Sequence, residues 1–384
     1  MRCALLILLA LLLAPVPAAQ AQITNAPAPK DKSAVMAETF AKGLVHPWGL
    51  QFLPAAEPYG GRLLVTERDG RVRLIGKDGA LSPPVAGVPK VHAQGQGGLL
   101  DVALDPKFAA NGWIYLAYAE PRDANLNGTT VARGRLVLDG TSARLADFNV
   151  IFRQDPSGTG GLHFGCRLVF ADDGMLFVTL GERYQKDYAQ DVRRSWGKVV
   201  RIAPDGSIPE DNPRFGATAA KGLWTIGHRN PQAAALHPET RKLWVVEHGP
   251  KGGDEVNVIE RGRNYGWPVI GYGIDYSGAK IHDGTHKDGM EQPIYYWRPS
   301  IAPSGMAFYT GDRFPQWKGN LFVGALAGQH LARLVLDGEK IVAEEKLLTD
   351  LGERIRDVRQ GPDGHLWLLT DHPEGRVLRV VGGP

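Results

Sequence analysis

The chain has 384 residues, of which 43% are apolar and 22% charged, and its formal net charge is +3. So small a positive balance, without a run of Lys or Arg, gives no reason to expect a nucleic acid as partner. The 48 glycines and 27 prolines leave few uninterrupted helical periods and favour many short strands joined by turns.

The N-terminus predicts a secretory signal peptide over residues 1–21. Arg2 supplies the positive end, the apolar run Leu5–Leu13 is too short to span a bilayer, and Ala19-Gln-Ala21 provides the small residues of a cleavage site. A membrane anchor is the alternative, but no cysteine for lipidation follows the run. Residues 22–34, rich in Ala, Pro and Lys, are expected to be a flexible leader. The mature protein should be periplasmic or secreted, with no membrane span.

One cysteine, Cys166, remains once the signal peptide is removed, so no intramolecular disulfide is possible. It lies in an apolar strand pattern, which favours a buried structural thiol over a reactive one. The core alone must therefore hold the fold, and about 360 residues suffice for that.

A strand-like segment recurs six times along the chain. Its copies begin 45 to 78 residues apart: Leu63–Thr66, Ile114–Ala117, Leu176–Thr179, Leu243–Val246, Leu321–Gly324 and Leu366–Leu369. In five copies a glycine stands two residues before the first apolar residue: Gly61, Gly112, Gly174, Gly319 and Gly364. Units of this size with loop insertions predict an all-β fold, a six-bladed β-propeller. A β-sandwich or two β domains are the alternatives, and six matching units argue against them.

We expect residues 35–384 to form a single propeller domain. Only a short stretch follows the sixth unit, so a strand from about Met36 to Leu44 would complete the last blade and leave no long exposed edge. Propellers place functional residues on loops at one mouth of the central channel. Candidate residues should therefore come from distant parts of the sequence.

The richest candidate segment is Ile226–Gln232, read together with His248–Glu255. The first places an imidazole, a guanidinium and an amide before Pro231, with Arg229 and Asn230 among them. The second is a glycine and proline loop whose backbone carbonyls can face a hard cation. Such a site suits an acidic organic cofactor assisted by a metal. Alternatively, Arg229 is a structural arginine paired with a carboxylate.

Two glycine-rich turns and one strand offer further polar groups. His163 lies in the turn Gly160–Arg167, where glycine lets a ligand approach and an imidazole can accept a proton near neutral pH. Gln96 lies in a similar turn. Arg354 and Arg356 alternate along a strand or its approach, which puts two guanidinium groups on one side, where they could bind carboxylates or face solvent.

Together these residues resemble the soluble sugar dehydrogenases that depend on pyrroloquinoline quinone (PQQ), and most closely their periplasmic aldose sugar dehydrogenase branch. The matching blocks follow the family's order through nearly the whole mature chain: Pro47–Leu50, Gly95–Leu100, His163–Phe170, Gly227–Gln232, Gly249–Pro250, Asp254–Glu255, Asn264–Pro268, Ala302–Gly305 and Arg354–Asp357. The resemblance implies a six-bladed propeller and a quinoprotein that oxidises aldoses at the anomeric carbon to lactones, with hydride transfer to PQQ. It names neither the sugar nor the electron acceptor.

The resemblance also implies a role for each candidate residue. His163 would be the general base that takes the proton of the anomeric hydroxyl. Arg229 would stabilise the charge that develops on the quinone oxygen. The residues that would contact PQQ are Gln96, Arg229, Asn230, Tyr276, Arg354 and Arg356.

Calcium is the second cofactor that the resemblance implies. The backbone carbonyls of Gly249 and Pro250 would hold the ion that bridges to PQQ. Glu255 and the Tyr265 carbonyl match a second, structural calcium site. The segment Asp254–Pro268 could supply oxygen ligands but is not an EF-hand loop, so its spacing alone does not establish a metal.

Three positions depart from the family pattern. Ala327 stands where the family commonly has a lysine on the cofactor, which would weaken PQQ binding by about 1–3 kcal/mol unless a neighbour compensates. Leu162 replaces the aspartate that precedes the catalytic histidine in the glucose-oxidising branch, so another group must orient His163. His248 replaces a glutamine of that branch, and glucose specificity is not carried over.

Two other functions stay open. A non-redox propeller that binds an extracellular sugar or protein would explain Ala327, but it would not need the whole set of candidate residues. A calcium-dependent lactonase should present several carboxylates at the channel mouth, whereas the candidates here are mostly cationic or amide.

Overall fold

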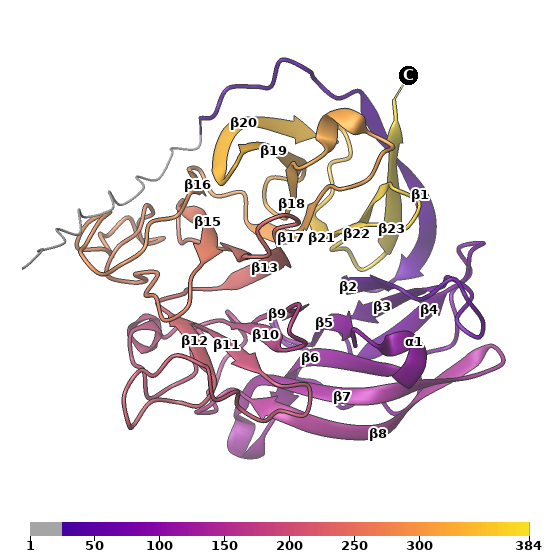
Figure 1. Ribbon diagram of the computed structural model, residues 1–384, viewed down its shortest axis with the longest axis horizontal. Coiled ribbons are helices and arrows are strands. Elements are labelled where there is room, and N and C mark those ends of the chain that lie inside the picture. The colour runs from indigo at the N-terminus through magenta and orange to yellow at the C-terminus, as the bar shows by residue number, and fades with distance from the viewer. Residues whose placement is uncertain (1–24, 384) are drawn as a thin grey trace, which may run out of the picture.

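The computed structural model describes residues 25–383, which form six antiparallel sheets arranged as blades around a central axis (Figure 1). The first three blades are β2 (Pro47–Phe52), β3 (Leu63–Glu67), β4 (Arg71–Ile75); β5 (Leu99–Leu104), β6 (Trp113–Pro121), β7 (Asn127–Asp139), β8 (Ser142–Arg153); and β9 (Gly165–Phe170), β10 (Leu176–Leu180), β11 (Lys198–Ile202), β12 (Leu223–Ile226).

The last three blades include the strand that begins the described chain. They are β13 (Pro231–Leu236), β14 (Leu243–Glu247), β15 (Asp254–Ile259), β16 (Tyr295–Trp297); β17 (Pro303–Phe308), β18 (Leu321–Ala325), β19 (Leu331–Asp337), β20 (Lys340–Leu347); and β21 (Ile355–Gln360), β22 (Leu366–Thr370), β23 (Gly375–Gly382) with β1 (Val35–Leu44). The helical elements are short: α1 (Phe108–Asn111) and the 3₁₀ turns Asp123–Asn125, Lys186–Ala189 and Pro315–Trp317.

The ring closes by pairing the two ends of the chain. β1 runs antiparallel to β23, with Val35 opposite Gly382, so the first strand of the sequence is the outermost strand of the last blade (Figure 1). The innermost strands contact one another in the order β2, β5, β9, β13, β17, β21 and back to β2. The predicted propeller and its closing strand are confirmed, which excludes a sandwich or two separate β domains.

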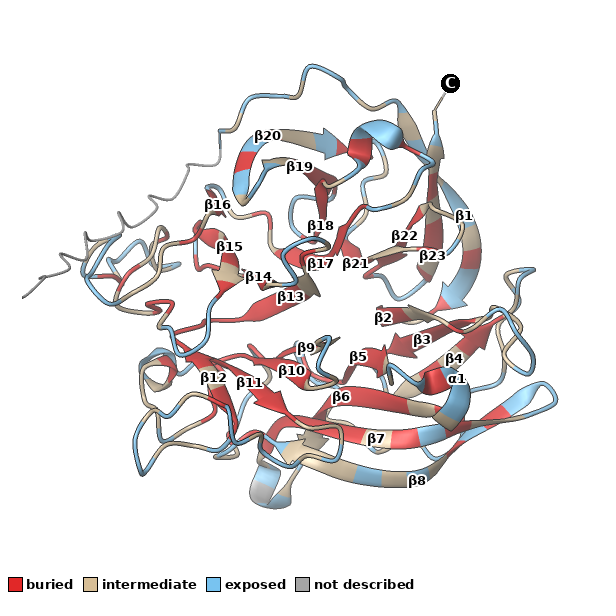
Figure 2. Cartoon of the chain, in the orientation of Figure 1, coloured by how far each residue is buried: buried red, intermediate tan, exposed pale blue. Residues whose placement is uncertain are grey.

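The six repeated segments are the second strands of the six blades: β3, β6, β10, β14, β18 and β22. They are apolar on both faces because packing covers both, and they are buried along most or all of their length (Figure 2). The five glycines that precede five of them all have a positive φ, between 68° and 81°. In the fourth blade Arg241 takes the glycine's place and adopts the same conformation, with a φ of 58°.

Two chain segments from each blade meet at one mouth of the channel. Because neighbouring strands are antiparallel, the start of each innermost strand lies beside the end of the second strand. All six innermost strands have a register irregularity near this start, and such bulges re-aim side chains. Six predicted site residues lie just before or at these starts: Gln96, His163, Arg229, Asn230, Arg354 and Arg356.

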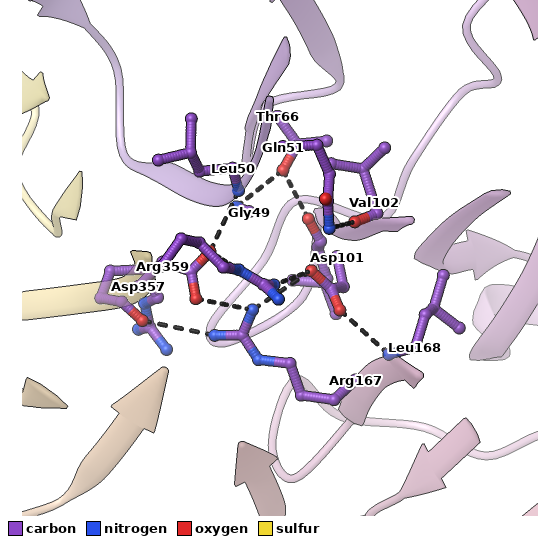
Figure 3. A network of polar contacts seen from close by, with 12 residues as sticks. Gly49, Leu50, Gln51, Thr66, Asp101, Val102, Arg167, Leu168, Asp357 and Arg359 are labelled. Carbon is purple, nitrogen blue, oxygen red and sulfur yellow. Dashed lines mark hydrogen bonds and ion pairs between the residues drawn. The ribbon is translucent and has the colours of Figure 1, made fainter. Parts of the chain in front are cut away.

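One layer further into the channel, buried charged side chains meet (Figure 3). Arg167 of β9 lies 3.1 Å from Asp101 of β5 and 3.0 Å from Asp357 of β21. Arg359 contacts the same two carboxylates at 3.1 and 3.0 Å. The backbone N–H of Leu168 donates to Asp101 at 2.9 Å. We call these four charged residues the channel plug; it ties the second, third and sixth blades together.

The structure describes only part of the N-terminal segment for which predictions were made. The predicted signal peptide, residues 1–21, lies outside the described residues. Residues 25–34 of the predicted leader have no regular secondary structure and contact the fifth blade, where the Ser33 backbone N–H donates to Glu345 at 2.7 Å; the flexibility of the leader stays a prediction. Within residues 25–383 no helix combines the length and apolarity needed to cross a membrane.

Cys166 is a buried residue of β9, as expected for a structural thiol. Burial raises the pKa of its thiol to about 12. At neutral pH the sulfur therefore stays protonated and is a poor nucleophile.

Candidate functional site

His163 lies in the loop that leads into β9, with a left-handed φ of 51°. Its backbone N–H donates to Gln96 Oε1 at 2.8 Å, and its ring Nδ1 lies 2.9 Å from Glu182 Oε2. Because a carboxylate only accepts hydrogen bonds, Nδ1 carries the proton and Nε2 keeps a lone pair. No described residue forms a hydrogen bond with Nε2. This nitrogen is therefore available to accept a proton.

Glu182 is the orienting group for His163 that the sequence reading did not identify. It comes two residues after β10, at the end of the third repeated segment. Its backbone N–H donates to Arg229 O at 2.9 Å, which joins the His163 and Arg229 loops. Its Oε2 also accepts from the backbone N–H of Tyr184. An acidic residue directly after a repeated strand is the signal that could have revealed it, because that end of the strand faces the mouth.

Arg183 holds the His163 loop in place. Its Nε donates to Leu162 O and its Nη2 to Gly160 O, both at 2.9 Å. Its guanidinium stacks on the Phe164 ring, 3.8 Å from the ring centre. Arg183 itself has a positive φ of 56°, a strained conformation that these contacts maintain.

The protonation state of His163 suits a base. Burial lowers the pKa of its imidazole, the hydrogen bond and charge of Glu182 raise it, and the charges of Arg229 and Arg183 lower it again. The net direction is downward, so the ring is neutral at neutral pH. A neutral, oriented imidazole with one free nitrogen can take a proton from a hydroxyl group.

Arg229 lies beside this loop and is buried. Its Nη1 donates to the carbonyls of His248 and Gly249, at 3.1 and 2.7 Å. Its backbone N–H donates to Glu247 at 2.6 Å, and its guanidinium lies 5.2 Å from the centre of the Trp267 ring. These contacts fix the guanidinium at the channel mouth.

Arg354 and Arg356 face one carboxylate, as their alternation along the strand predicts. Asp371 Oδ2 lies 3.3 Å from Arg354 and 3.1 Å from Arg356, and Oδ1 lies 2.9 Å from His46 Nδ1. Burial raises the pKa of Asp371, but the guanidinium groups outweigh it and hold this pKa well below its usual range. Burial lowers the pKa of Arg356 to about 10.

His248 lies close both to Arg229 and to the pair Arg354 and Arg356. It lines a cavity of about 350 Å³ together with Gln96, Arg354 and Arg356. Burial lowers the pKa of His248 to about 3 against the hydrogen bond to the Pro303 carbonyl, and the charges of Arg229 and Arg356, with that of His163 when it is protonated, lower it as well. Three residues predicted to form one site, Arg229, Arg356 and His163, therefore lie close enough to His248 to affect its pKa.

Tyr276 lies at a neighbouring cavity of about 350 Å³, which it lines with Glu182, Arg229 and Pro250. It is 62% exposed. Arg229 borders this cavity and contacts the backbone of His248, so the two cavities adjoin at the Arg229 loop.

Buried N–H donors without a hydrogen-bond partner among the described residues gather at this mouth. They are Arg68 Nε, Arg229 Nε, Asn230 Nδ2 and Arg356 Nε. A buried donor left unpaired costs about 1–3 kcal/mol. The mouth is therefore suited to a ligand rich in acceptors and negative charge.

The predicted calcium ligands line one small, adjacent cavity: Gly249, Pro250, Glu255 and Tyr265, together with Glu247. The pKa of Glu255 is raised well above its usual range, first by burial and then by the charge of Glu247. A cation would relieve this repulsion, so the residues fit calcium. Residues 25–383 hold no cluster of three or more His, Cys, Asp or Glu placed to bind a metal. A calcium site here would therefore also need backbone carbonyl ligands.

Fold and site together define a propeller whose channel mouth combines an oriented imidazole with unpaired cationic donors. The family of glucose/sorbosone dehydrogenases matches residues 44–379. This chain belongs to that family, which confirms the resemblance seen in its sequence.

Relatives cover nearly the whole chain. The aldose sugar dehydrogenase YliI of Escherichia coli (strain K12) is 47% identical over 349 residues, which cover 90% of this chain and 92% of that protein. A crystal structure of a glucose dehydrogenase is 51% identical with a TM-score of 0.87, covering 91% of this chain and 100% of the other. The PQQ-bound aldose sugar dehydrogenase of Streptomyces coelicolor is 29% identical with a TM-score of 0.74, covering 92% and 100%.

Proposed function

We propose that this protein oxidises aldose sugars at the anomeric carbon to lactones. PQQ, when bound, would accept the hydride from that carbon. His163 Nε2 would take the proton of the anomeric hydroxyl, and Arg229 would face the oxygen on which negative charge develops. The aldose and PQQ are carried over from the relatives as expectations for this chain.

The observation that carries the proposal is the group of unpaired donors around a neutral imidazole. PQQ has three carboxylates and two quinone oxygens, all of them acceptors. Arg229 Nε, Asn230 Nδ2 and Arg356 Nε are buried N–H groups that lack a partner within residues 25–383. A calcium-dependent lactonase should present several carboxylates at the channel mouth, whereas these unpaired groups are cationic or amide donors.

Calcium and export are further parts of the proposal. The carbonyls of Gly249 and Pro250 would hold one calcium ion as a Lewis acid, and Glu255 with Tyr265 would hold a structural one. Gly249 O already accepts from Arg229 and keeps one lone pair for a metal. We also propose that the mature protein is periplasmic or secreted, because residues 1–21 have the pattern of a secretory signal peptide.

The test is reconstitution. Purified apoprotein receives PQQ and Ca²⁺, and dye reduction is measured with a panel of aldoses. We expect activity with at least one aldose, and we expect His163→Ala to lower kcat by about a hundred- to ten-thousand-fold while PQQ still binds. Absence of both PQQ binding and turnover would favour the non-redox binder. Unchanged turnover in His163→Ala would refute its role as base.

A further inference from the structure

Arg68 borders the cavity of Arg354 and Arg356, although the resemblance gives it no role. It follows β3 directly, and its backbone is fixed at both groups. Its N–H donates to His46 O at 3.1 Å, and its carbonyl accepts from the Leu99 N–H at 3.0 Å. Its side chain has one polar contact, from Nη2 to a backbone carbonyl at 2.9 Å.

Arg68 is an arginine of this cavity that has no ion-pair partner among the described residues. Arg354 and Arg356 share Asp371 as their ion-pair partner. Arg68 forms no ion pair within the described chain, and its Nε is buried without a hydrogen-bond partner. Burial raises the pKa of Asp371 and its ion pairs lower it, whereas burial lowers the pKa of Arg356 and its ion pair raises it. The charge of Arg68 contributes a further lowering to both pKa values, so Arg68 lies close to both groups. A carboxylate ligand would satisfy both the donor and the charge.

We propose that Arg68 binds a carboxylate of PQQ and supplies the cation that is absent at Ala327. This inference rests on the proposed function and adds a residue to its cofactor site. Leu326, next to Ala327, borders the same cavity as Arg68. A guanidinium from the first blade therefore takes the place of an ammonium from the fifth. Its planar fork can also hold a carboxylate through two parallel N–H bonds.

Two probes separate a carboxylate contact from a merely structural effect: PQQ and its trimethyl ester, whose carboxylates are neutral. Each is titrated by equilibrium dialysis against the folded apoprotein at a fixed Ca²⁺ concentration. Arg68→Met should weaken PQQ binding by about ten- to a hundredfold and leave ester binding nearly unchanged. The preference for the acid over the ester should fall by the same factor.

Two further variants sharpen the result. Arg144→Ala removes one exposed positive charge from β8 and should bind both probes like the wild type. Arg68→Gln keeps a donor for the Gly95 carbonyl but loses the charge, and it decides the question if Arg68→Met does not fold. A wild-type preference for the acid in folded Arg68 variants would overturn the role of Arg68 alone. Failure of the wild type to bind PQQ at all would instead overturn the proposed function.

Discussion

The channel plug and the channel mouth both bury arginines, yet they treat them differently. In the plug, Arg167 and Arg359 each contact two carboxylates, Asp101 and Asp357 (Figure 3). At the mouth, the arginines have fewer carboxylates than guanidinium groups and keep unpaired Nε donors. Charges buried for structure are matched in place, whereas charges buried for a ligand are left incomplete.

The largest effect is expected in the plug. Arg167→Met leaves the buried carboxylates of Asp101 and Asp357 with one shared guanidinium, that of the partly exposed Arg359, which should cost about 3–5 kcal/mol of stability. Urea unfolding measures it. Arg135→Met is the matched control, because Arg135 is an exposed arginine paired with Asp147, and its loss should cost about 0–1 kcal/mol. Equal losses in the two variants would mean that the plug is not a structural element.

The second prediction concerns the stability effect of the carboxyl groups of Glu255 and Glu247 at the proposed calcium site. Burial and the charge of Glu247 raise the pKa of Glu255, so the folded apoprotein holds a proton there that the unfolded chain releases. Its stability should therefore fall as pH rises above the usual carboxyl pKa toward the raised one. Calcium at about 100 times its Kd should restore about 2.7 kcal/mol.

Glu255→Gln tests this directly. Thermal unfolding with and without Ca²⁺ should show that the variant has lost the part of the fall of stability with pH that Glu255 causes, together with the calcium gain of the structural site. Glu260→Gln, at an exposed carboxylate just beyond the same strand, should keep both. A full calcium response in Glu255→Gln would remove Glu255 from the metal site.

The mouth should respond to substitution in the opposite way from the plug. Arg356→Met leaves the buried carboxylate of Asp371 with Arg354 and His46, so we expect a smaller loss of stability than in the plug, about 1–3 kcal/mol. PQQ binding, however, should weaken by about ten- to a hundredfold. Unfolding measured with and without PQQ gives both quantities, and a loss of stability as large as that of Arg167→Met would erase the distinction between mouth and plug.

The fold could be predicted because its signal repeats. Each second strand is apolar on both faces since each is covered on both faces, and the glycine two residues before it marks a turn with positive φ in five blades. The fourth blade has Arg241 in place of this glycine, although the backbone of Arg241 adopts the same conformation. Strand pairing at the closure followed from the short stretch after the sixth segment.

The site could be predicted only where the sequence carries a recognisable motif. His163 and Arg229 stand in such motifs, but Glu182 and Arg68 do not. Both of these follow the end of a second strand, and only the antiparallel pairing within a blade brings that end to the mouth. The local sequence pattern cannot show that Glu182 and Arg68 lie beside the other site residues, because those contacts form only when the blades close into a ring.

The smallest expected effect tests how Glu182 serves His163. Its hydrogen bond and charge raise the pKa of His163 against the lowering by burial, so Glu182→Gln should lower this pKa further. The base acts when unprotonated, so the acid limb of kcat/KM against pH should move to lower pH. The plateau should fall by about tenfold, because an amide no longer selects the tautomer with a free Nε2. Glu182→Asp should restore part of both. A lower plateau with an unmoved limb would mean that Glu182 only supports the loop.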